Sequence, residues 1–197
     1  MWKGKNVTVF VTGGIAAFKA ATLVRLFVKA GANVEVAMTK SACEFITPLT
    51  FQVLTKNKVH IDTFDEDEAN KVQHIHLADQ TDVAIVVPAT ANTIAKMANG
   101  IADNFVTSTL LATTAPIYVV PAMNEHMWEN PATVRNVKQL VEDGKSVIEP
   151  ATGFLAEGYT GKGRLPEPEE IFEQITFLES KRVSKSPLKG KSVLITA

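Results

Sequence analysis

Short runs of mainly β-branched apolar residues recur along the chain, separated by segments long enough to form helices. Within each run, polar and apolar positions do not alternate, so both faces of the expected strand are apolar. Strands of this kind are typical of a parallel sheet that is covered on both faces. The runs that predict strands are Val7–Thr12, Val34–Met38, Val83–Val87, Ile117–Val120 and, more weakly, Ser146–Glu149.

The segments between these runs repeat their apolar positions at helical spacing. In Ala16–Ala30, apolar residues from Ala20 to Val28 form one stripe, and Gly31 follows as a residue that favours helix ends. Further helices are predicted at 90–99, 106–111, 134–141 and 167–181. This alternation predicts an α/β protein with a doubly wound parallel sheet in a three-layer α/β/α sandwich. Ligands of such sheets bind at the carboxyl ends of the strands.

The predicted domain ends near residue 180. We expect residues 1–180 to form one domain and residues 181–191, which are basic and contain serine, to form a linker. Residues 192–197 are strand-like and, like the run at residues 7–12, come shortly after a Lys-Gly-Lys sequence. We therefore expect residues 192–197 to be the first strand of a truncated second domain.

Composition narrows the function classes. The chain has 197 residues, of which 46% are hydrophobic, and a net charge of -1, which disfavours nucleic-acid binding. Cys43 is the only cysteine, which excludes an internal disulfide and a multi-cysteine metal site. No apolar run is long enough to span a membrane, and the N-terminus lacks a signal-peptide profile. We expect a soluble, cytoplasmic protein.

The first strand runs directly into a tight turn that opens a helix, Gly13-Gly14-Ile15. Adjacent glycines let backbone N–H groups approach an anion, and a helix N-terminus favours negative charge. The turn matches neither G-x-G-x-x-G nor the Walker pattern. A phosphate site and a plain strand-to-helix turn therefore both remain open.

Hydroxyl and amide side chains follow the second and third strands. Thr39 and Ser41 come after Met38, where they either contact a ligand or cap a helix. After the third strand, small residues would let a flat ligand approach, and polar residues would bind the edge of a heterocycle. These residues are Pro88, Ala89, Thr90, Ala91, Asn92 and Thr93. Downstream, Asp103 is a candidate helix cap, and Cys43 is expected to have a packing role.

The segment Pro121–Trp128 places one uncharged amide, Asn124, among large apolar side chains. An asparagine NH2 group donates to a carboxylate without adding charge, and apolar neighbours strengthen that bond by excluding water. Met123, Met127 and Trp128 supply such neighbours. The alternative is that these three side chains belong to the ordinary core.

Two further segments are candidates for chemistry. His74 and His76 would share one face of a strand, but no third ligand with suitable spacing follows, so we expect no metal. A single histidine would serve better as a general base, and the resemblance described below favours His74 for that role. Leu155–Arg164 is rich in glycine and lacks periodicity. It is interpreted as either a flap that closes over substrate or a disordered connector.

Together these motifs resemble the flavin-dependent cysteine decarboxylases, in particular the phosphopantothenoylcysteine decarboxylase domains of bifunctional coenzyme A biosynthesis proteins. The resemblance covers nearly all of residues 4–180, and the Pro-x-Met-Asn-x-x-Met-Trp pattern is complete. The segment 188–197 is similar to the start of the partner phosphopantothenate–cysteine ligase domain. The motifs that carry the resemblance are Gly13–Ala17, His74-Ile75, Pro88–Thr93, Pro121–Trp128 and Gly158–Arg164.

The resemblance implies a flavodoxin-like sandwich that binds FMN between subunits of a homotrimer, commonly four trimers in a dodecamer. It implies that FMN contacts Gly13, Gly14, Ile15, Ser41, Pro88, Thr90, Asn92, Thr93 and Met123. The substrate, 4'-phosphopantothenoylcysteine, would contact Asn124, Met127, Ala156 and Gly158. The product would be 4'-phosphopantetheine, formed through a thioaldehyde, loss of CO2 and re-reduction. The residue matching His74 would assist removal of the thiol proton, and the one matching Asn124 would hold the carboxylate.

One position departs from the family pattern. Many relatives carry Ala-Cys-Gly in the flap, where the cysteine is the acid for the final reduction, whereas this chain reads Ala156-Glu157-Gly158. We expect Glu157, with its pKa raised inside a closed flap, to take over as proton donor, and the alternative is that Glu157 is a solvated flap residue. The alternatives are an oxidative peptidyl-cysteine decarboxylase that stops at the enethiol, a non-catalytic FMN-binding regulatory subunit, and a flavin prenyltransferase. The acidic tail of the regulatory subunits is absent from this sequence, and the prenyltransferases lack an intact Pro-Ala-Met-Asn segment.

Overall fold

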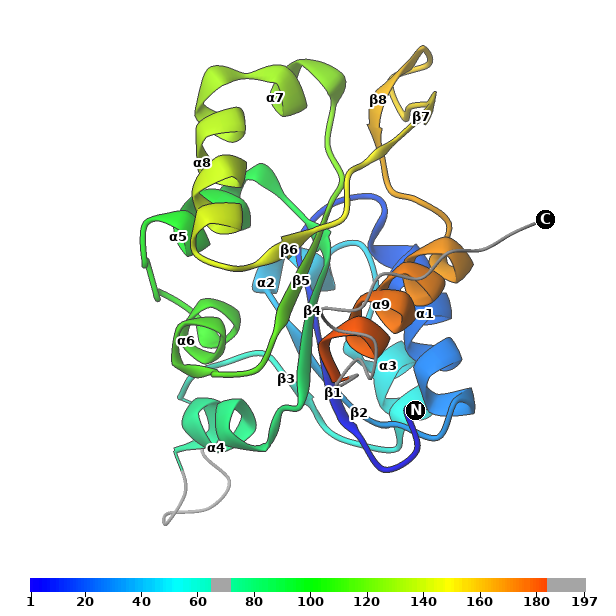
Figure 1. Cartoon of the computed structure of the whole chain (residues 1–197), viewed down its shortest axis with the longest axis vertical. Coiled ribbons are helices and arrows are strands. Elements are labelled where there is room, and N and C mark those ends of the chain that lie inside the picture. Colours follow the sequence, from blue (N-terminus) through cyan, green and yellow to red (C-terminus); the bar gives the residue numbers. More distant parts are fainter. Residues whose placement is uncertain (65–71, 184–197) are drawn as a thin grey trace, which may run out of the picture.

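The structure is a computed structural model that describes residues 1–64 and 72–183 (Figure 1). Its main sheet has six strands, all parallel, in the order β3-β2-β1-β4-β5-β6. The strands are β1 Asn6–Val11, β2 Asn33–Met38, β3 Val59–His60, β4 Val83–Ala89, β5 Ile117–Pro121 and β6 Ser146–Val147. The parallel sheet predicted from the apolar runs is therefore confirmed. Among the strands of this main sheet, only the short edge strand β3 was not predicted.

The strand order explains where ligands can bind. Without the short edge strand, the order is that of flavodoxin, and β3 extends it to the order of dinucleotide-binding sheets. In both descriptions, the direction in which strands are added reverses between β1 and β4. The loops after these two strands therefore diverge to opposite faces and leave a crevice at the carboxyl edge.

Helices cover both faces of the sheet. Figure 1 shows α1, α3 and α9 on one face and α4, α5, α6 and α8 on the other. Two buried clusters correspond to these faces, with Val9 of β1 in one and its neighbour Phe10 in the other. The helices are α1 Ala17–Lys29, α2 Lys40–Cys43, α3 Pro48–Thr55, α4 Gln73–Gln80, α5 Ala91–Ala98, α6 Phe105–Ala112, α7 Glu125–Glu129, α8 Pro131–Glu142 and α9 Pro168–Val183. The three-layer sandwich is confirmed.

Local details correct two predictions. The segment with His74 and His76 is helix α4, not a strand, so residues two apart point away from each other. The cap of α6 is Asn104, whose side chain accepts from the Thr107 backbone N–H at 3.0 Å. Asp103, the predicted cap, instead accepts from Lys96 Nζ at 2.6 Å.

The glycine-rich segment forms an ordered hairpin, β7 Ala151–Phe154 paired antiparallel with β8 Thr160–Arg164. Helix α9 then packs beside α1 and extends to Val183, two residues beyond the predicted end. The remainder of the predicted linker, 184–191, and the predicted strand, 192–197, lie outside the described residues. Within the described residues, no helix combines the length and apolar character that crossing a membrane requires.

Candidate active site

Two adjoining cavities open at the carboxyl edge of the sheet. The first, of about 660 Å³, lies among the ends of β1, β2 and β4 and the start of α6; we call it the strand-edge cavity. The second, of about 580 Å³, lies among the start of α1, the loop 122–127 and the β7–β8 hairpin; we call it the hairpin cavity. Gly13, Thr90, Ala91 and Met127 line both. One ligand in each cavity would therefore be in contact with the other.

The loop after β1 lies directly against α2. A Cβ atom on Gly13 would be 2.4 Å from Ser41 Cβ and 2.9 Å from the Ser41 carbonyl carbon, so only glycine fits there. The two hydroxyls after β2 have different tasks. Both line the cavity, but the Thr39 hydroxyl also caps α2 by accepting from the Ala42 N–H at 3.2 Å.

The loop after β4 is held by a chain of hydroxyl hydrogen bonds. Thr12 Oγ1 donates to the Pro88 carbonyl at 2.6 Å and accepts from the Thr90 N–H at 3.0 Å. Thr90 Oγ1 in turn donates to Thr93 Oγ1 at 3.2 Å and accepts from its N–H at 3.3 Å. Thr12 is fully buried, so this wall is fixed before any ligand arrives. Pro88 supports the wall but does not line the cavity.

The strand-edge cavity suits a flat, partly polar ligand. Ser41, Thr90, Asn92 and Thr93 supply hydroxyl and amide groups on one side, and Phe105 supplies an aromatic surface. Its volume lies within the range of small-molecule and cofactor sites. Among the described residues, no group of three or more His, Cys, Asp and Glu side chains is arranged to hold a metal ion.

The hairpin cavity contains the predicted amide. Asn124 Nδ2 donates to Glu157 Oε1 at 3.1 Å and to the Tyr159 hydroxyl at 2.6 Å. Its Oδ1 accepts from the His126 N–H at 2.9 Å, which fixes the plane of the amide and points the NH2 group at the hairpin. Asn124 and Glu157 are thus brought together as predicted. Tyr159 had no predicted role, although its place beside Gly158 in the flap motif was a usable signal.

The hairpin is docked on the Asn124 loop by its own backbone. Met123 N–H donates to the Gly163 carbonyl at 3.0 Å, and Lys162 N–H donates to Glu125 Oε1 at 2.8 Å. A Cβ atom on Gly163 would lie 2.1 Å from the Met123 carbonyl oxygen. The second glycine, Gly161, faces the Glu125 carboxylate in the same way at 2.8 Å. These glycines bring the two segments within hydrogen-bonding distance of each other.

The apolar side chains around Asn124 are not ordinary core. No residue of α7 is buried, and Met127 is 49% exposed. Met127 lines both cavities, and Met123 lines the hairpin cavity. The alternative interpretation as core is therefore wrong for Met127, whereas Met123 both packs against the core and forms part of a cavity wall.

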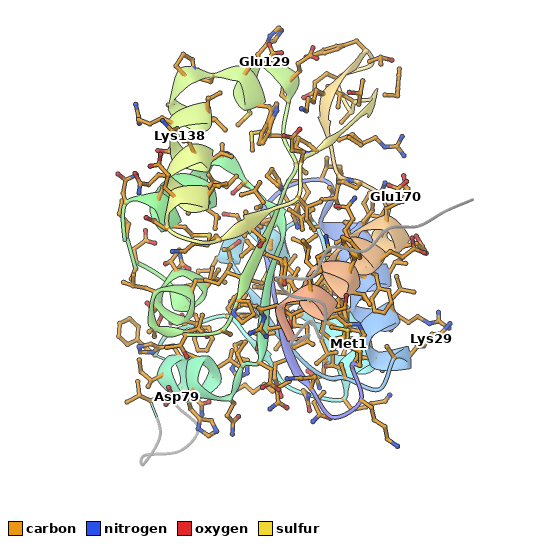
Figure 2. The ribbon with its side chains drawn as sticks, in the orientation of Figure 1. Met1, Lys29, Asp79, Glu129, Lys138 and Glu170 are labelled. Carbon is orange, nitrogen blue, oxygen red and sulfur yellow. The ribbon has the colours of Figure 1, made fainter. Side chains whose placement is uncertain are left out.

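His74 lines neither of the two cavities, and so does not share one with Asn124. It lies near the start of α4, where its ring contacts Phe105 edge-on with centroids 6.4 Å apart. Its Nδ1 is buried without a hydrogen-bond partner among the described residues. Figure 2 places Asp79 of α4 and Glu129 of α7 at opposite ends of the molecule, so the helix of His74 is far from the Asn124 loop. Gly158 also lies outside both cavity linings.

Cys43 ends α2, and its thiol donates weakly to the Thr39 carbonyl at 3.6 Å. Burial, together with the neighbouring carboxylate of Glu44, raises the pKa of Cys43. A raised pKa disfavours the nucleophilic thiolate. The expected packing role fits this environment.

Comparison with known proteins places the chain in a family. The family model described as flavoprotein matches residues 1–178. The chain belongs to the flavoprotein family. A flavin is therefore its cofactor class, and the strand-edge cavity is the part of this flavoprotein whose size and polar groups fit a flavin.

Individual relatives are more specific. The flavoprotein chain is 52% identical to the coenzyme A biosynthesis bifunctional protein CoaBC of Bacillus subtilis (strain 168), over 100% of this chain and 48% of that protein. It is also similar to a PPC decarboxylase mutant complexed with pantothenoylaminoethenethiol, with 32% identity, a TM-score of 0.81, and 90% and 100% of the two chains covered. The FMN binding protein AtHal3 matches at 33% identity and a TM-score of 0.78, covering 92% and 100%. The chain spans about half the length of the curated relatives it matches.

Proposed function

We propose that this chain is a carboxy-lyase of coenzyme A biosynthesis that decarboxylates 4'-phosphopantothenoylcysteine to 4'-phosphopantetheine with FMN as cofactor. The observation that carries the proposal is the contact between Asn124 and the Glu157 carboxylate in the hairpin cavity, which adjoins the strand-edge cavity proposed for the flavin. A substrate carboxylate would accept the same hydrogen bond. The similarity to PPC decarboxylase and to CoaBC supports this substrate.

FMN would lie in the strand-edge cavity. The turn after β1 and the polar residues after β2 and β4 would hold it, with Met123 at the boundary to the substrate. The residues of the strand-edge cavity proposed to contact FMN are Gly13, Ser41, Thr90, Asn92 and Thr93. Gly14, Ile15 and Met123 would contact it from the adjoining hairpin cavity, and Pro88 would support the wall through its hydrogen bond with Thr12. When bound, FMN supplies reversible hydride acceptance, so that the oxidised cysteine side chain becomes an electron sink for the loss of CO2.

Asn124 would hold the substrate carboxylate without neutralising it. A neutral amide orients the group but leaves its negative charge able to depart into CO2, whereas a lysine or arginine would stabilise the carboxylate before reaction. Met127 and Ala156, which line the hairpin cavity, would exclude water from the substrate carboxylate. Gly158, which lies outside the cavity lining, would reach the substrate only if the hairpin tip moved inward. The free-energy cost of moving the hairpin tip is small, since the bonds from Asn124 to Glu157 and Tyr159 are exposed, while the bonds at the base of the hairpin can stay in place.

His74 would act on the thiol proton of a substrate bound by another copy of the chain. Within one protomer its helix is far from Asn124, and its Nδ1 lacks a hydrogen-bond partner among the described residues. Both observations support a homo-oligomer, a trimer or a dodecamer, in which α4 of one subunit completes the site of the next. Sedimentation analysis tests this directly, because a stable monomer with full activity is incompatible with a shared site.

Glu157 would replace the flap cysteine of other relatives as proton donor in the final reduction. Its carboxylate lies beside Asn124, which would place it close to a substrate whose carboxylate is held by that amide. Product mass decides this role. Wild type is expected to give 4'-phosphopantetheine, and Glu157→Gln a product two hydrogens lighter, with exposed Glu129→Gln on α7 as the matched control. Equal rates of the same reduced product from wild type and Glu157→Gln would exclude the role.

The missing flap cysteine also favours a second candidate, an oxidative cysteine decarboxylase that stops at the enethiol. The same product-mass experiment separates the two, because the second candidate gives the lighter product already in wild type. Peptide substrates ending in cysteine would then be decarboxylated faster than 4'-phosphopantothenoylcysteine.

We further propose a cytoplasmic enzyme of which residues 1–180 are the decarboxylase domain. In the whole protein, residues 181–191 would link it to a phosphopantothenate–cysteine ligase domain beginning at 192. The bifunctional name of the CoaBC relatives and the 48% coverage of one of them support this arrangement. The first experiment is a visible spectrum of the purified protein, followed by CO2 release from 4'-phosphopantothenoylcysteine. A protein that binds no FMN cannot have the proposed function.

A further inference from the structure

Two cations meet on one carboxylate in the wall of the hairpin cavity. Lys19 Nζ donates to both carboxylate oxygens of Glu167 at 3.0 Å, and Arg164 Nη2 donates to Oε1 at 2.5 Å. Lys19 lies in the first turn of α1, Arg164 ends β8, and Glu167 precedes α9. Lys19 and Arg164 line the cavity itself, and Glu167 lies behind them.

Lys19, Arg164 and Glu167 together carry a net positive charge. The hydrogen bond from Lys19, aided by the charge of Arg164, lowers the pKa of Glu167, so this carboxylate is ionised at neutral pH. Two cations and one anion leave a net charge of about +1. The first turn of α1 contains no acidic residue, and its N-cap Ala16 has no side-chain cap, so the helix end adds positive potential rather than cancelling it.

We propose, resting on the proposed function, that Lys19 and Arg164 form the subsite for the phosphate of the substrate. The lysine side chain is only 16% exposed, so it is held at the cavity wall rather than moving freely in water. The arginine side chain is 44% exposed and has further N–H donors besides the one used by Glu167. A phosphate would bind between them and share them with Glu167.

Asn124 and the two cations line the same cavity, so one substrate can contact all three. The backbone of Asn124 lies near the base of the hairpin, since a Cβ atom on Gly163 would be 3.4 Å from the Asn124 carbonyl carbon and Arg164 is the next residue. In the extended substrate, about twelve bonds separate the carboxylate carbon from phosphorus, which is about 14 Å, so a substrate whose carboxylate is held by Asn124 can reach the cations without being fully extended.

A purely structural role would be an ion-pair tether between α1 and the start of α9. The two roles predict opposite results for Glu167→Gln. If the role were only structural, Glu167→Gln would lose stability and activity in the same way as Lys19→Gln. In a phosphate subsite, the uncharged amide would release both cations and strengthen phosphate binding.

The kinetic test compares 4'-phosphopantothenoylcysteine with pantothenoylcysteine, which lacks the phosphate. We expect Lys19→Gln and Arg164→Gln each to raise KM for the phosphorylated substrate about tenfold, with little change for the other. Glu167→Gln is expected to lower KM for the phosphorylated substrate. Lys19→Arg, which keeps the positive charge that Lys19→Gln removes, is expected to keep KM for the phosphorylated substrate near the wild-type value. The controls are Arg25→Gln and Lys29→Gln, exposed positions on the same helix; Figure 2 shows Lys29 away from Glu170. Equal losses on both substrates would overturn the subsite.

A binding test without turnover separates this inference from the proposed function. Calorimetry with 4'-phosphopantothenate and with pantothenate measures the phosphate contribution in a pair that cannot be decarboxylated. Tighter binding of the phosphorylated ligand to wild type, lost in Lys19→Gln, supports the subsite even if no CO2 is released. Decarboxylation of both substrates with identical binding of the two ligands overturns the subsite and leaves the proposed function standing.

Discussion

The site has two walls of different construction. The strand-edge wall is made of backbone and hydroxyl groups at the ends of parallel strands, with Thr12 fully buried and Thr93 only 3% exposed. The hairpin wall consists of the two strands β7 and β8, and Phe154 within it is 68% exposed. Its tip reaches Asn124 through two exposed hydrogen bonds that use both amide hydrogens.

This difference assigns each wall a separate task. A wall that is hydrogen-bonded within itself can hold a resident cofactor without rearranging. In the hairpin wall, Asn124 Nδ2 donates to Glu157 and to Tyr159. Under the proposed function, a substrate carboxylate would take over these hydrogen bonds, so the hairpin tip would have to move before each turnover. Substitutions in the two walls should therefore separate into those that lose flavin and those that keep flavin but lose turnover.

The largest effect is expected from Asn124→Asp in the hairpin wall. The new carboxylate would repel both the substrate carboxylate and Glu157, and the donor would be lost. By analogy with the removal of one transition-state hydrogen-bond donor, turnover should fall by about 100- to 1000-fold. CO2 release measures the loss, and the visible spectrum should still show bound flavin. Loss of flavin in this variant would show that the walls are not independent.

A smaller loss of turnover is expected from Gly163→Ala. The new methyl group would overlap the Met123 carbonyl oxygen, which is backbone and cannot swing away, so the hairpin would be displaced. A displacement of about 1 Å can cost on the order of 100-fold in kcat/KM. Gly161→Ala is the matched comparison, since its methyl group meets the movable Glu125 carboxylate and should cost less. Equal effects of the two substitutions would contradict this account of docking.

On the strand-edge wall, Gly13→Ala should weaken flavin binding. Its methyl group would overlap Ser41 Cβ and force the loop after β1 away from α2. Overpacking of this kind costs about 1–3 kcal/mol, so we expect flavin affinity to fall about tenfold. Fluorescence titration with FMN measures it. Gly14→Ala is the comparison. It should displace the loop less than Gly13→Ala does, because its methyl group meets only Thr90 Cγ2 at an ordinary 3.8 Å.

The fold was accessible to sequence analysis because its signals are local and strong. The apolar runs of the long strands and the stripe of α1 follow from the burial of both sheet faces. The strand β3 has only two residues and carries no such pattern. The histidine segment was misjudged because His74 and His76 alone do not reveal a helix, whose packing depends on Leu77 and Ala78 against the sheet.

The site was predicted in part. Polar residues after parallel strands meet at one edge, which brought Ser41 and Thr90 to one cavity as expected. The contacts of Asn124 with Tyr159 and of Lys19 with Glu167 join residues 35 and 148 positions apart, and no local pattern encodes such pairs. The hairpin was also hidden, because glycines that permit close docking look the same in sequence as glycines of a connector.

The smallest effect on the site is expected from Tyr118→Phe, which lies far from both walls. Tyr118 donates at 2.7 Å to Glu179, whose side chain is almost fully buried and is also bound by Arg182. Burial acts to raise the pKa of Glu179, but the hydrogen bonds from Arg182 and Tyr118 outweigh it and hold the pKa below its usual value. Removing the phenol hydroxyl should cost about 1–2 kcal/mol at neutral pH.

The pH dependence of this loss tests its origin. Because the pKa of Glu179 is lower in the folded than in the unfolded chain, its contribution to stability is present above the ordinary glutamate pKa of about 4.3 and is lost as the pH falls through the folded value. Denaturant titrations should therefore show a gap between wild type and Tyr118→Phe at pH 7 that narrows below about pH 4. Flavin affinity and turnover should stay near wild type at neutral pH. A change in either would mean that packing of α9 against β5 is transmitted to the cavities, and that the two walls share a support beneath the sheet edge.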